Sequence, residues 1–192
     1  MAHVNKLRYL SQVIFKNPTE LLRLARTAWT TAKFRWIQRC AGGGTTIEPL
    51  TRIVNSANVR IGRGCLIKEA VYLRAGPEGR ITLGDRVAIN AHARIYGHGG
   101  VDIGEDSQLG PGVTITTTDH DWANNLEARF VPVTLGKFVW IGANVTILPG
   151  VEIGDHSVVG AGAVVSKSIP PRSVAVGVPA KVIKSVDDLR GS

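Results

Sequence analysis

An aliphatic residue recurs at every sixth position through the C-terminal part of the chain. The clearest run has five such residues: Ile141, Ile147, Ile153, Val159 and Val165. A small or apolar residue stands four positions after each of them, and glycine follows several directly. A period of six matches neither the 3.6 residues of an α-helix nor the two-residue alternation of a strand. It predicts a parallel β-helix, in which each six-residue unit forms one short strand and one corner of a solenoid.

The same frame can be followed toward the N-terminus in groups of about three units. A pattern of apolar, polar, aliphatic and glycine residues precedes each new run at 59–62, 81–84, 101–104 and 133–136. Three units per coil predict a triangular prism whose aliphatic side chains stack roughly 4.8 Å apart in a dry core. We therefore expect a mainly β protein, with the β-helix over residues 45–178 and a C-terminal tail over 179–192.

Residues 1–44 predict a basic, amphipathic helical segment. Residues 1–40 hold eight Lys or Arg against Glu20, and so carry seven of the eight net positive charges of the chain. Pro18 and Glu20 are typical of a helix start, and a shorter helix is expected around Leu7, Leu10 and Ile14. Glycines 42–44 predict a hinge into the prism.

An apolar stripe at helical spacing follows this start. Its members are Leu22, Ala25, Trp29, Ala32 and Trp36. We expect the stripe to pack on the prism or on a neighbouring subunit. The alternative is a surface that rests on anionic lipid through residues 1–40 or faces a membrane-bound partner. Nucleic acid is not expected, because no base-reading motif accompanies the basic charge.

Cysteine content and hydropathy indicate a reducing compartment. The chain has two cysteines, Cys40 and Cys65, too few for a disulfide framework. No apolar run reaches the roughly 20 residues that a membrane span needs, and charges stand where a signal peptide has its apolar core. We expect a cytoplasmic protein, with Cys65 as a buried thiol.

One polar insertion, residues 116–132, interrupts the six-residue frame. Loops that leave a rigid repeat often carry functional residues, and this one contains Asp119, His120 and Asp121. The imidazole of His120 can accept a proton near neutral pH, and a neighbouring carboxylate could orient it. The alternative is a solvated loop histidine without a chemical role.

The combination of repeats, histidine loop and C-terminal ending resembles the hexapeptide-repeat acyltransferases, most closely the galactoside and maltose O-acetyltransferase group. The resemblance covers about residues 80–184 and rests on the segments 139–143, 149–154, 159–163, 169–171 and 177–183. It implies a left-handed coil and a homotrimer with active sites between neighbouring prisms. It also implies acetyl-CoA as co-substrate, with no metal required.

The resemblance also assigns residue roles. His120 matches the catalytic base, whereas Asn90 and Trp122 are expected to bind the acceptor, although Asn90 could simply form a turn. The backbone N–H of Ala143 is expected to stabilise the oxyanion. The positions expected to bind the cofactor are Trp140, Ala143, Ala161, Lys167, Lys181 and Lys184.

The chain departs from the galactoside and maltose enzymes at residues 96–99. Where those enzymes carry paired acidic residues beside the acceptor, this sequence reads Tyr-Gly-His-Gly. His98 could contact a different sugar, but we interpret it as a surface histidine on a corner. The basic N-terminal segment resembles that of acetyltransferases of polysaccharide or O-antigen biosynthesis. We therefore expect O-acetylation of a sugar hydroxyl in such a pathway.

Three other functions are weighed against this expectation. One is an N-acetyltransferase that acts on a nucleotide-linked amino sugar, and another is a non-catalytic, membrane-associated scaffold trimer. The third, a zinc enzyme similar to the γ-class carbonic anhydrases, is disfavoured because the close histidine pair of that family is missing from this sequence.

Overall fold

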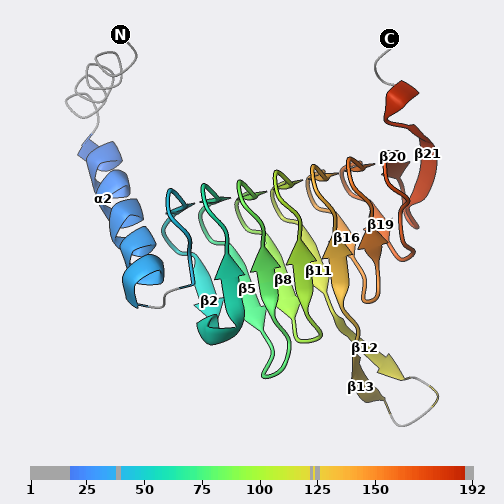
Figure 1. Cartoon of the computed structure of the whole chain (residues 1–192), viewed down its shortest axis with the longest axis horizontal. Coiled ribbons are helices and arrows are strands. Elements are labelled where there is room, and N and C mark those ends of the chain that lie inside the picture. The colour runs from blue at the N-terminus through green and yellow to red at the C-terminus, as the bar shows by residue number, and fades with distance from the viewer. Residues whose placement is uncertain (1–17, 38–39, 122, 124–125, 189–192) are drawn as a thin grey trace.

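The computed structural model describes residues 18–37, 40–121, 123 and 126–188. Helix α2 (Pro18–Ala32) continues into the π-helical turn η1 (Lys33–Ile37), and a solenoid of short strands follows (Figure 1). The shorter helix predicted around Leu7, Leu10 and Ile14 lies outside the described residues. The predicted β-helix with an N-terminal helix is confirmed.

Three parallel sheets form the faces of the prism, and each coil in the middle of the prism contributes one strand to each sheet. Sheet I contains β1 (Thr46–Ile47), β4 (Leu66–Ile67), β7 (Ala88–Ile89), β10 (Gln108–Leu109), β15 (Trp140–Ile141), β18 (Val158–Val159), β20 (Ser173–Val176) and the antiparallel β21 (Lys181–Ser185). Sheet II contains β2 (Arg52–Val54), β5 (Tyr72–Ala75), β8 (Arg94–Gly97), β11 (Thr114–Thr116), β16 (Thr146–Ile147) and β19 (Val164–Val165). Sheet III contains β3 (Val59–Ile61), β6 (Ile81–Leu83), β9 (Val101–Ile103), β14 (Val133–Leu135) and β17 (Glu152–Ile153), and a 3₁₀ turn, η2 (Ser56–Asn58), precedes β3.

The register of these strands explains the period of six. Parallel pairing places the aliphatic residue of each unit directly over that of the next coil. Along sheet I this column comprises Ile47, Ile67, Ile89, Leu109, Ile141 and Val159, none more than 1% exposed. Because every coil buries the same kind of side chain against its neighbours, the repeat in the sequence becomes one continuous core.

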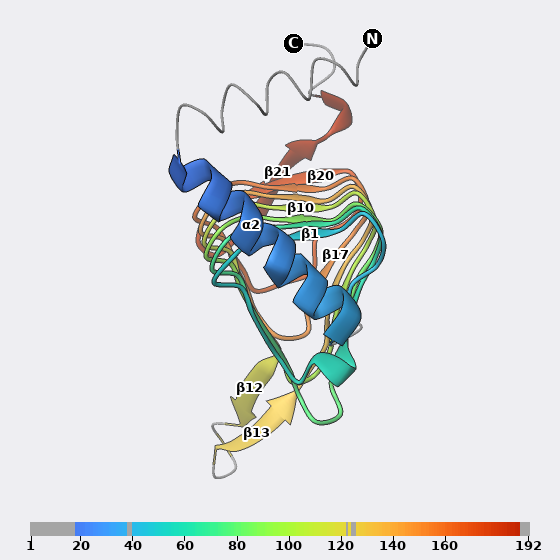
Figure 2. The same cartoon turned by 90° about the vertical axis from the view of Figure 1, so that its left-hand side faces the viewer.

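Helix α2 lies across the N-terminal end of the prism (Figure 2). The Phe34 ring enters the core and is only 2% exposed. The Thr31 hydroxyl accepts a hydrogen bond from the Ile47 amide at 2.8 Å and lies 3.2 Å from the Ile47 carbonyl. The helix therefore caps the first coil, which would otherwise expose the apolar interior of the solenoid.

The apolar stripe of α2 is largely exposed at Leu22 and Trp29. Leu22 is 53% exposed and Trp29 is 70% exposed. Leu22 lines a cavity beside Pro49 and Leu50 of the prism, but Trp29 does not pack on the prism of its own chain. Phe34 and Thr31 make the contact with the first coil. No helix in the described ranges is long and apolar enough to cross a membrane.

The glycine segment before β1 is part of the solenoid and does not act as a hinge. The Gly42 amide donates a hydrogen bond of 2.8 Å to the Ile61 carbonyl. A Cβ atom on Gly42 would lie 2.6 Å from the Gly62 carbonyl oxygen. Glycine is therefore needed at this corner because the backbones of two coils approach closely.

Candidate active site

A two-stranded hairpin projects from the edge where sheets II and III meet, here called the II–III edge (Figures 1 and 2). Its strands are β12 (Thr118–Asp121) and β13 (Glu127–Phe130). Thr117 is fully buried at the base of the hairpin, where its hydroxyl donates to the Tyr96 carbonyl at 2.9 Å and accepts from the Gly99 amide at 2.8 Å. These bonds tie the start of the hairpin to the preceding coil.

His120 lies on β12 and is exposed. Its Nδ1 is 2.9 Å from the backbone carbonyl oxygen of Leu126. A carbonyl oxygen can only accept a hydrogen bond, so we assign the proton of the neutral imidazole to Nδ1, which leaves the lone pair of Nε2 available as a base. The predicted catalytic histidine thus has the tautomer that a general base needs.

The group that lies against the imidazole of His120 is the backbone carbonyl of Leu126, whereas the sequence left open whether a neighbouring carboxylate orients the ring. Asp119 Oδ1 accepts a hydrogen bond of 2.8 Å from the backbone amide of His120, and Asp121 forms an ion pair with Arg129. The Leu126 backbone is in the left-handed region, with φ of 58°. Because Leu126 acts through its backbone, its side chain gives no sequence signal for this role.

Strand register places His120 and Phe130 on one face of the hairpin. His120 is paired with Ala128, and Thr118 with Phe130, in the antiparallel ladder. Side chains that are directly opposite, or two residues apart along a strand, share a face. The Thr118–Phe130 pair is two residues nearer the base of the hairpin than the His120–Ala128 pair. The Phe130 ring therefore lies closer to the prism than the imidazole of His120. The ion pair of Arg129 occupies the other face.

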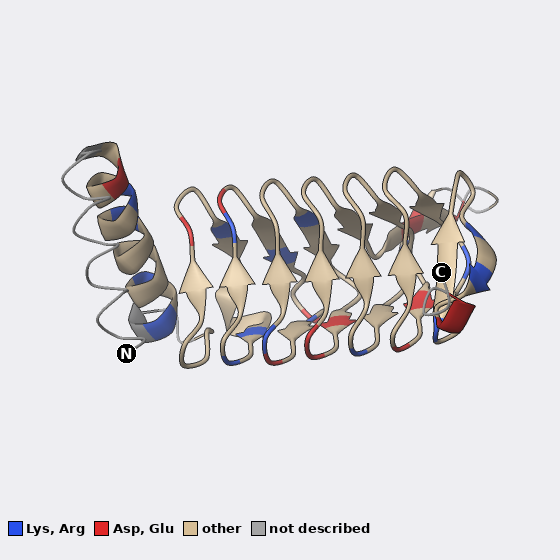
Figure 3. Cartoon of the chain, turned by 90° about the horizontal axis from the view of Figure 1, so that it is seen from above, with Lys and Arg blue, Asp and Glu red and all other residues tan. Residues whose placement is uncertain are grey.

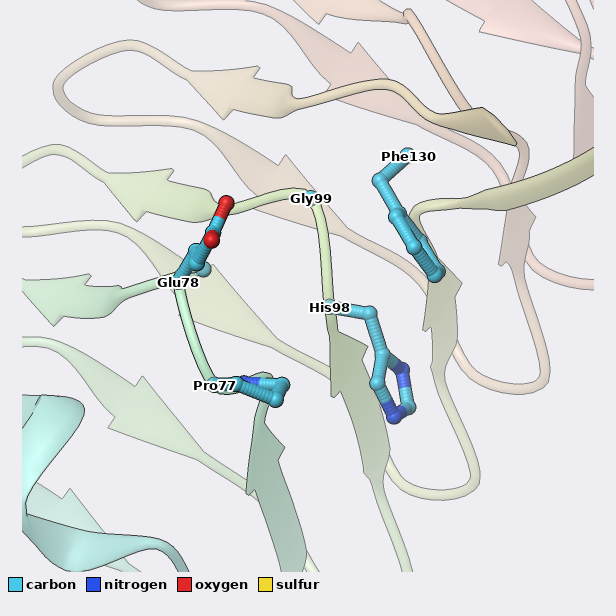
Figure 4. A pocket seen from close by; sticks show the side chains of 6 residues that line it. Pro77, Glu78, His98, Gly99 and Phe130 are labelled. Atoms are coloured by element: carbon cyan, nitrogen blue, oxygen red, sulfur yellow. The ribbon is translucent and has the colours of Figure 1, made fainter. Parts of the chain in front are cut away.

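A pocket of about 460 Å³ lies at the base of the hairpin, between two corners of the II–III edge and β13 (Figure 4). Its lining residues are Pro77, Glu78, Gly79, His98, Gly99 and Phe130. The rings of His98 and Phe130 stack with centroids 6.0 Å apart and planes inclined by 27°. We call this cavity the hairpin pocket.

The interpretation of His98 as a simple surface histidine is wrong. The side chain is half-buried, and its Nδ1 is shielded from solvent without a hydrogen-bond partner among the described residues. Buried polar atoms are nearly always satisfied, so such a nitrogen is typical of a site that a ligand or water completes. The sequence did not indicate this burial, because the ring that covers His98 comes from Phe130 on the inserted hairpin.

A second group of predicted residues lies on a different edge, where sheets I and II meet, here called the I–II edge. Asn90, Ala143 and Ala161 occupy equivalent corners after β7, β15 and β18. Among the hydrogen bonds of the described residues, the amides of Ala143 and Ala161 donate to no acceptor. Trp140 stands just before this edge on the outer face of sheet I and is 59% exposed.

Asn90 has a structural bond in addition to its predicted role. Its side-chain Nδ2 donates to the Leu109 carbonyl of the next coil at 2.9 Å. The bond supports the alternative that Asn90 stabilises a corner. This bond uses only the amide nitrogen, so the side-chain oxygen of Asn90 can still accept a hydrogen bond from a ligand.

The two edges are well separated within one chain. In the coil that contains Ala143, about five residues of sheet II lead from the I–II edge to the II–III edge, a path of roughly 15 Å. The hairpin with His120 then projects away from the prism. A single chain therefore does not bring His120 together with Ala143 or Asn90.

The three lysines predicted to bind the cofactor lie in two different parts of the prism. Lys167 is exposed on the II–III edge, whereas Lys181 and Lys184 are exposed on β21 at the C-terminal end of sheet I. Basic residues on β21 and on α2 are visible at the two ends of the prism in Figure 3. Trp122, predicted to bind the acceptor, lies outside the described residues.

Metal-ligating side chains do not converge in the part of the chain that the structure describes. No three His, Cys, Asp or Glu residues there are grouped so that they could hold a metal ion. The histidine spacing in the sequence disfavours a zinc site of the γ-class carbonic anhydrase type.

The triangular prism with a histidine-bearing hairpin defines a hexapeptide-repeat β-helix protein, and comparisons with known proteins identify the family. The family model described as bacterial transferase hexapeptide (six repeats) matches residues 132–167. Galactoside O-acetyltransferase of Escherichia coli K12 is 36% identical over 146 residues, which cover 74% of this chain and 71% of that protein. The chain belongs to the hexapeptide-repeat acetyltransferases.

Two further proteins are similar to this chain, one in sequence and one in its solved structure. The putative lipopolysaccharide biosynthesis O-acetyl transferase WbbJ of Escherichia coli K12 is 34% identical over 145 residues, which cover 69% of this chain and 74% of WbbJ. A point mutant of AntD, an N-acyltransferase from Bacillus cereus solved with dTDP and coenzyme A, superposes with a TM-score of 0.70. It is 25% identical, and the match covers 78% of this chain and 87% of AntD.

Proposed function

We propose that this protein transfers an acetyl group from acetyl-CoA to a sugar hydroxyl in cell-surface polysaccharide or O-antigen biosynthesis. The observation that carries the proposal is the contact between His120 Nδ1 and the Leu126 carbonyl, which leaves Nε2 as a base on an exposed hairpin. The O-acetyltransferase relatives and the coenzyme A complex of AntD support the donor and the reaction class.

In the proposed reaction, His120 Nε2 removes the proton of the acceptor hydroxyl as its oxygen attacks the thioester carbonyl of acetyl-CoA. The backbone N–H of Ala143 from a neighbouring copy stabilises the developing oxyanion. Collapse of the tetrahedral intermediate breaks the C–S bond, and the imidazolium returns the proton to the CoA thiolate. General-base assistance of this kind is typically worth ~10²–10⁴-fold in rate.

We also propose a homotrimer whose active sites combine two copies. The roughly 15 Å path between the I–II and II–III edges exceeds the near-contact distance that proton transfer requires. A neighbouring prism that presents its I–II edge to the hairpin would complete the site. Asn90, Trp140 and Ala143 would then come from one copy and His120 from the next.

Subunit mixing tests the composite site. His120→Ala and Asn90→Ala chains, each nearly inactive alone, are unfolded together and refolded as mixed oligomers. If each site takes its hairpin from one copy and its I–II edge from another, mixing restores up to about a quarter of wild-type sites. Mixed oligomers that stay as inactive as the parents would refute the composite arrangement.

Release of CoA from acetyl-CoA tests the reaction itself. Free sugars, nucleotide-linked amino sugars and lipid-linked oligosaccharides are offered as acceptors. His120→Ala should lower kcat at least ~100-fold, while the control His156→Ala, whose ring stacks on Phe138 far from both edges, should not. Failure of every acceptor, together with failure to bind CoA, would favour a non-catalytic scaffold trimer.

A second candidate function is N-acetylation of a nucleotide-linked amino sugar. The similarity to AntD favours it, because that N-acyltransferase is solved with dTDP and coenzyme A. His120 could accept a proton from an attacking amine as well as from a hydroxyl. Product analysis distinguishes the two, since an acetyl ester is cleaved by mild base and an acetamide is not.

For the location of the enzyme, we propose the cytoplasm, at the inner membrane face. Leu22 and Trp29 form an exposed apolar ridge on α2, and Arg26 and Lys33 lie on the same helical segment. Basic amphipathic helices of this kind bind anionic lipid. Vesicles with phosphatidylglycerol should sediment wild-type protein but not a Leu22→Ser/Trp29→Ser variant, and equal binding by both would contradict the proposal.

A further inference from the structure

The outer face of sheet II carries a cluster of arginine and tyrosine side chains. In the register of the sheet, Arg52, Tyr72 and Arg94 form one row across three coils, and Arg74 and Tyr96 lie beside each other in the next row. Together with Leu50, Ala70 and Val71 they line a groove of about 530 Å³. We call it the arginine groove.

The positive charge of the groove has no acidic counterpart. No Asp or Glu lines it, and none of the ion pairs between described residues includes its three arginines. Elsewhere on the prism Arg86 and Arg172 are paired with aspartates. Strands two apart are only about 10 Å from each other, so the grouped guanidinium charges repel one another and attract anions.

The aromatic rings give the groove a second binding property. The Tyr72 and Tyr96 rings lie 5.7 Å apart with an interplanar angle of 56°, and the Arg52 guanidinium is 5.9 Å from the Tyr72 ring centroid. Half-buried rings of this kind offer apolar faces with hydroxyl groups at their ends. A ligand that has both an apolar ring face and a negative charge fits this chemistry.

Strand β8 connects the groove to the hairpin pocket. Arg94, Tyr96 and His98 are two residues apart, so they share the outward face of the chain as it runs toward the II–III edge. His98 is the residue that stacks on Phe130, and Phe130 shares the hairpin face with His120. The outward face of this strand thus leads from the arginines toward the hairpin that carries His120.

We propose that the arginine groove binds an oxyanion of the acceptor, so that the acceptor of this enzyme is an acidic sugar derivative. The guanidinium groups pair with a phosphate or carboxylate, the tyrosine rings stack on the adjoining sugar, and the next sugar enters the hairpin pocket beside His120. This inference rests on the proposed acetyl transfer and names the class of its acceptor.

Acetyl transfer is measured with three acceptor groups that distinguish the sources of the oxyanion: nucleoside diphosphate sugars, uronic-acid oligosaccharides and neutral oligosaccharides. The variants are Arg94→Gln and Arg52→Gln/Arg94→Gln. The control is Arg63→Gln, which removes one positive charge at the corner between β3 of sheet III and β4 of sheet I. Loss of charged hydrogen bonds should raise KM for the acidic acceptor ~10–100-fold. The KM for acetyl-CoA should not change.

The outcomes separate this inference from the proposed function. Unchanged acceptor KM in both groove variants, with turnover still dependent on His120, would overturn the groove and leave acetyl transfer standing. Binding of the same acidic probes to His120→Ala is measured by calorimetry, which needs no turnover. Probe binding that is lost in Arg52→Gln/Arg94→Gln supports the groove, and failure of all acidic probes to bind overturns it.

Discussion

Replacement of Phe34 by alanine should remove most of the cap on the first coil. The ring is 2% exposed, and an aromatic side chain buries about 150–250 Å². At ~25 cal/mol per Å² this corresponds to roughly 4–6 kcal/mol as an upper estimate, close to the ~3–5 kcal/mol typical of Phe→Ala in cores. A protein of this length should lose about 6–20 °C in Tm.

Urea unfolding followed by circular dichroism measures the free energy of unfolding, and hydrogen exchange locates the effect. Because each coil contacts only its neighbours, exchange in Phe34→Ala should rise in β1 before it rises in β15. Trp29→Ala removes a larger but 70% exposed ring from the same helical segment and should cost less than ~1 kcal/mol. A loss below ~1 kcal/mol for Phe34→Ala would refute the cap.

Three further predictions concern the thiols, a corner glycine and the hairpin. Cys40 and Cys65 are each 1% exposed, and burial raises the pKa of both thiols. A thiol reagent at about pH 8 should therefore modify them only after unfolding. Rapid labelling of the native protein would contradict their burial. Gly142→Ala should lower both stability and kcat, because its Cβ would lie 2.5 Å from backbone of the next coil, whereas Gly43→Ala meets nothing closer than 3.9 Å and should be neutral. Equal effects in thermal unfolding and kinetics would count against this difference. Arg129→Gln breaks an exposed ion pair worth less than ~1 kcal/mol, so kcat/KM should fall by no more than about fivefold; a hundredfold loss would mean that Arg129 contacts substrate.

The prism could be predicted from the sequence because its core is built from one repeated contact. Ile89, Leu109 and Ile141 stack in one column. Each six-residue unit therefore has an aliphatic residue at the same buried position, and the sequence shows this as a repeat. The N-terminal helix was predicted as a helix, but the side that it buries was not. The helical spacing indicated an apolar side with Leu22 and Trp29, but the aromatic residue Phe34, which enters the core, lies outside that stripe.

The candidate site was less predictable because it depends on contacts without a repeat. His120 stood out since its loop broke the frame, but the carbonyl that orients it belongs to a backbone group six residues away. The hairpin pocket needs Phe130 to cover His98, which follows from antiparallel pairing inside the insertion. That pairing has no six-residue signal.

The stacking of coils fixes distances along the prism axis in steps of one strand spacing. From β10, in the coil that carries the hairpin, sheet I runs through β15 and β18 to β20, against which the lysines of β21 lie. These three steps span about 14 Å. An insertion or deletion of whole coils would change this span only in increments of about 4.8 Å. The length of any molecule that reaches from the hairpin to the C-terminal lysines is therefore set by the number of coils, and point mutations leave it unchanged.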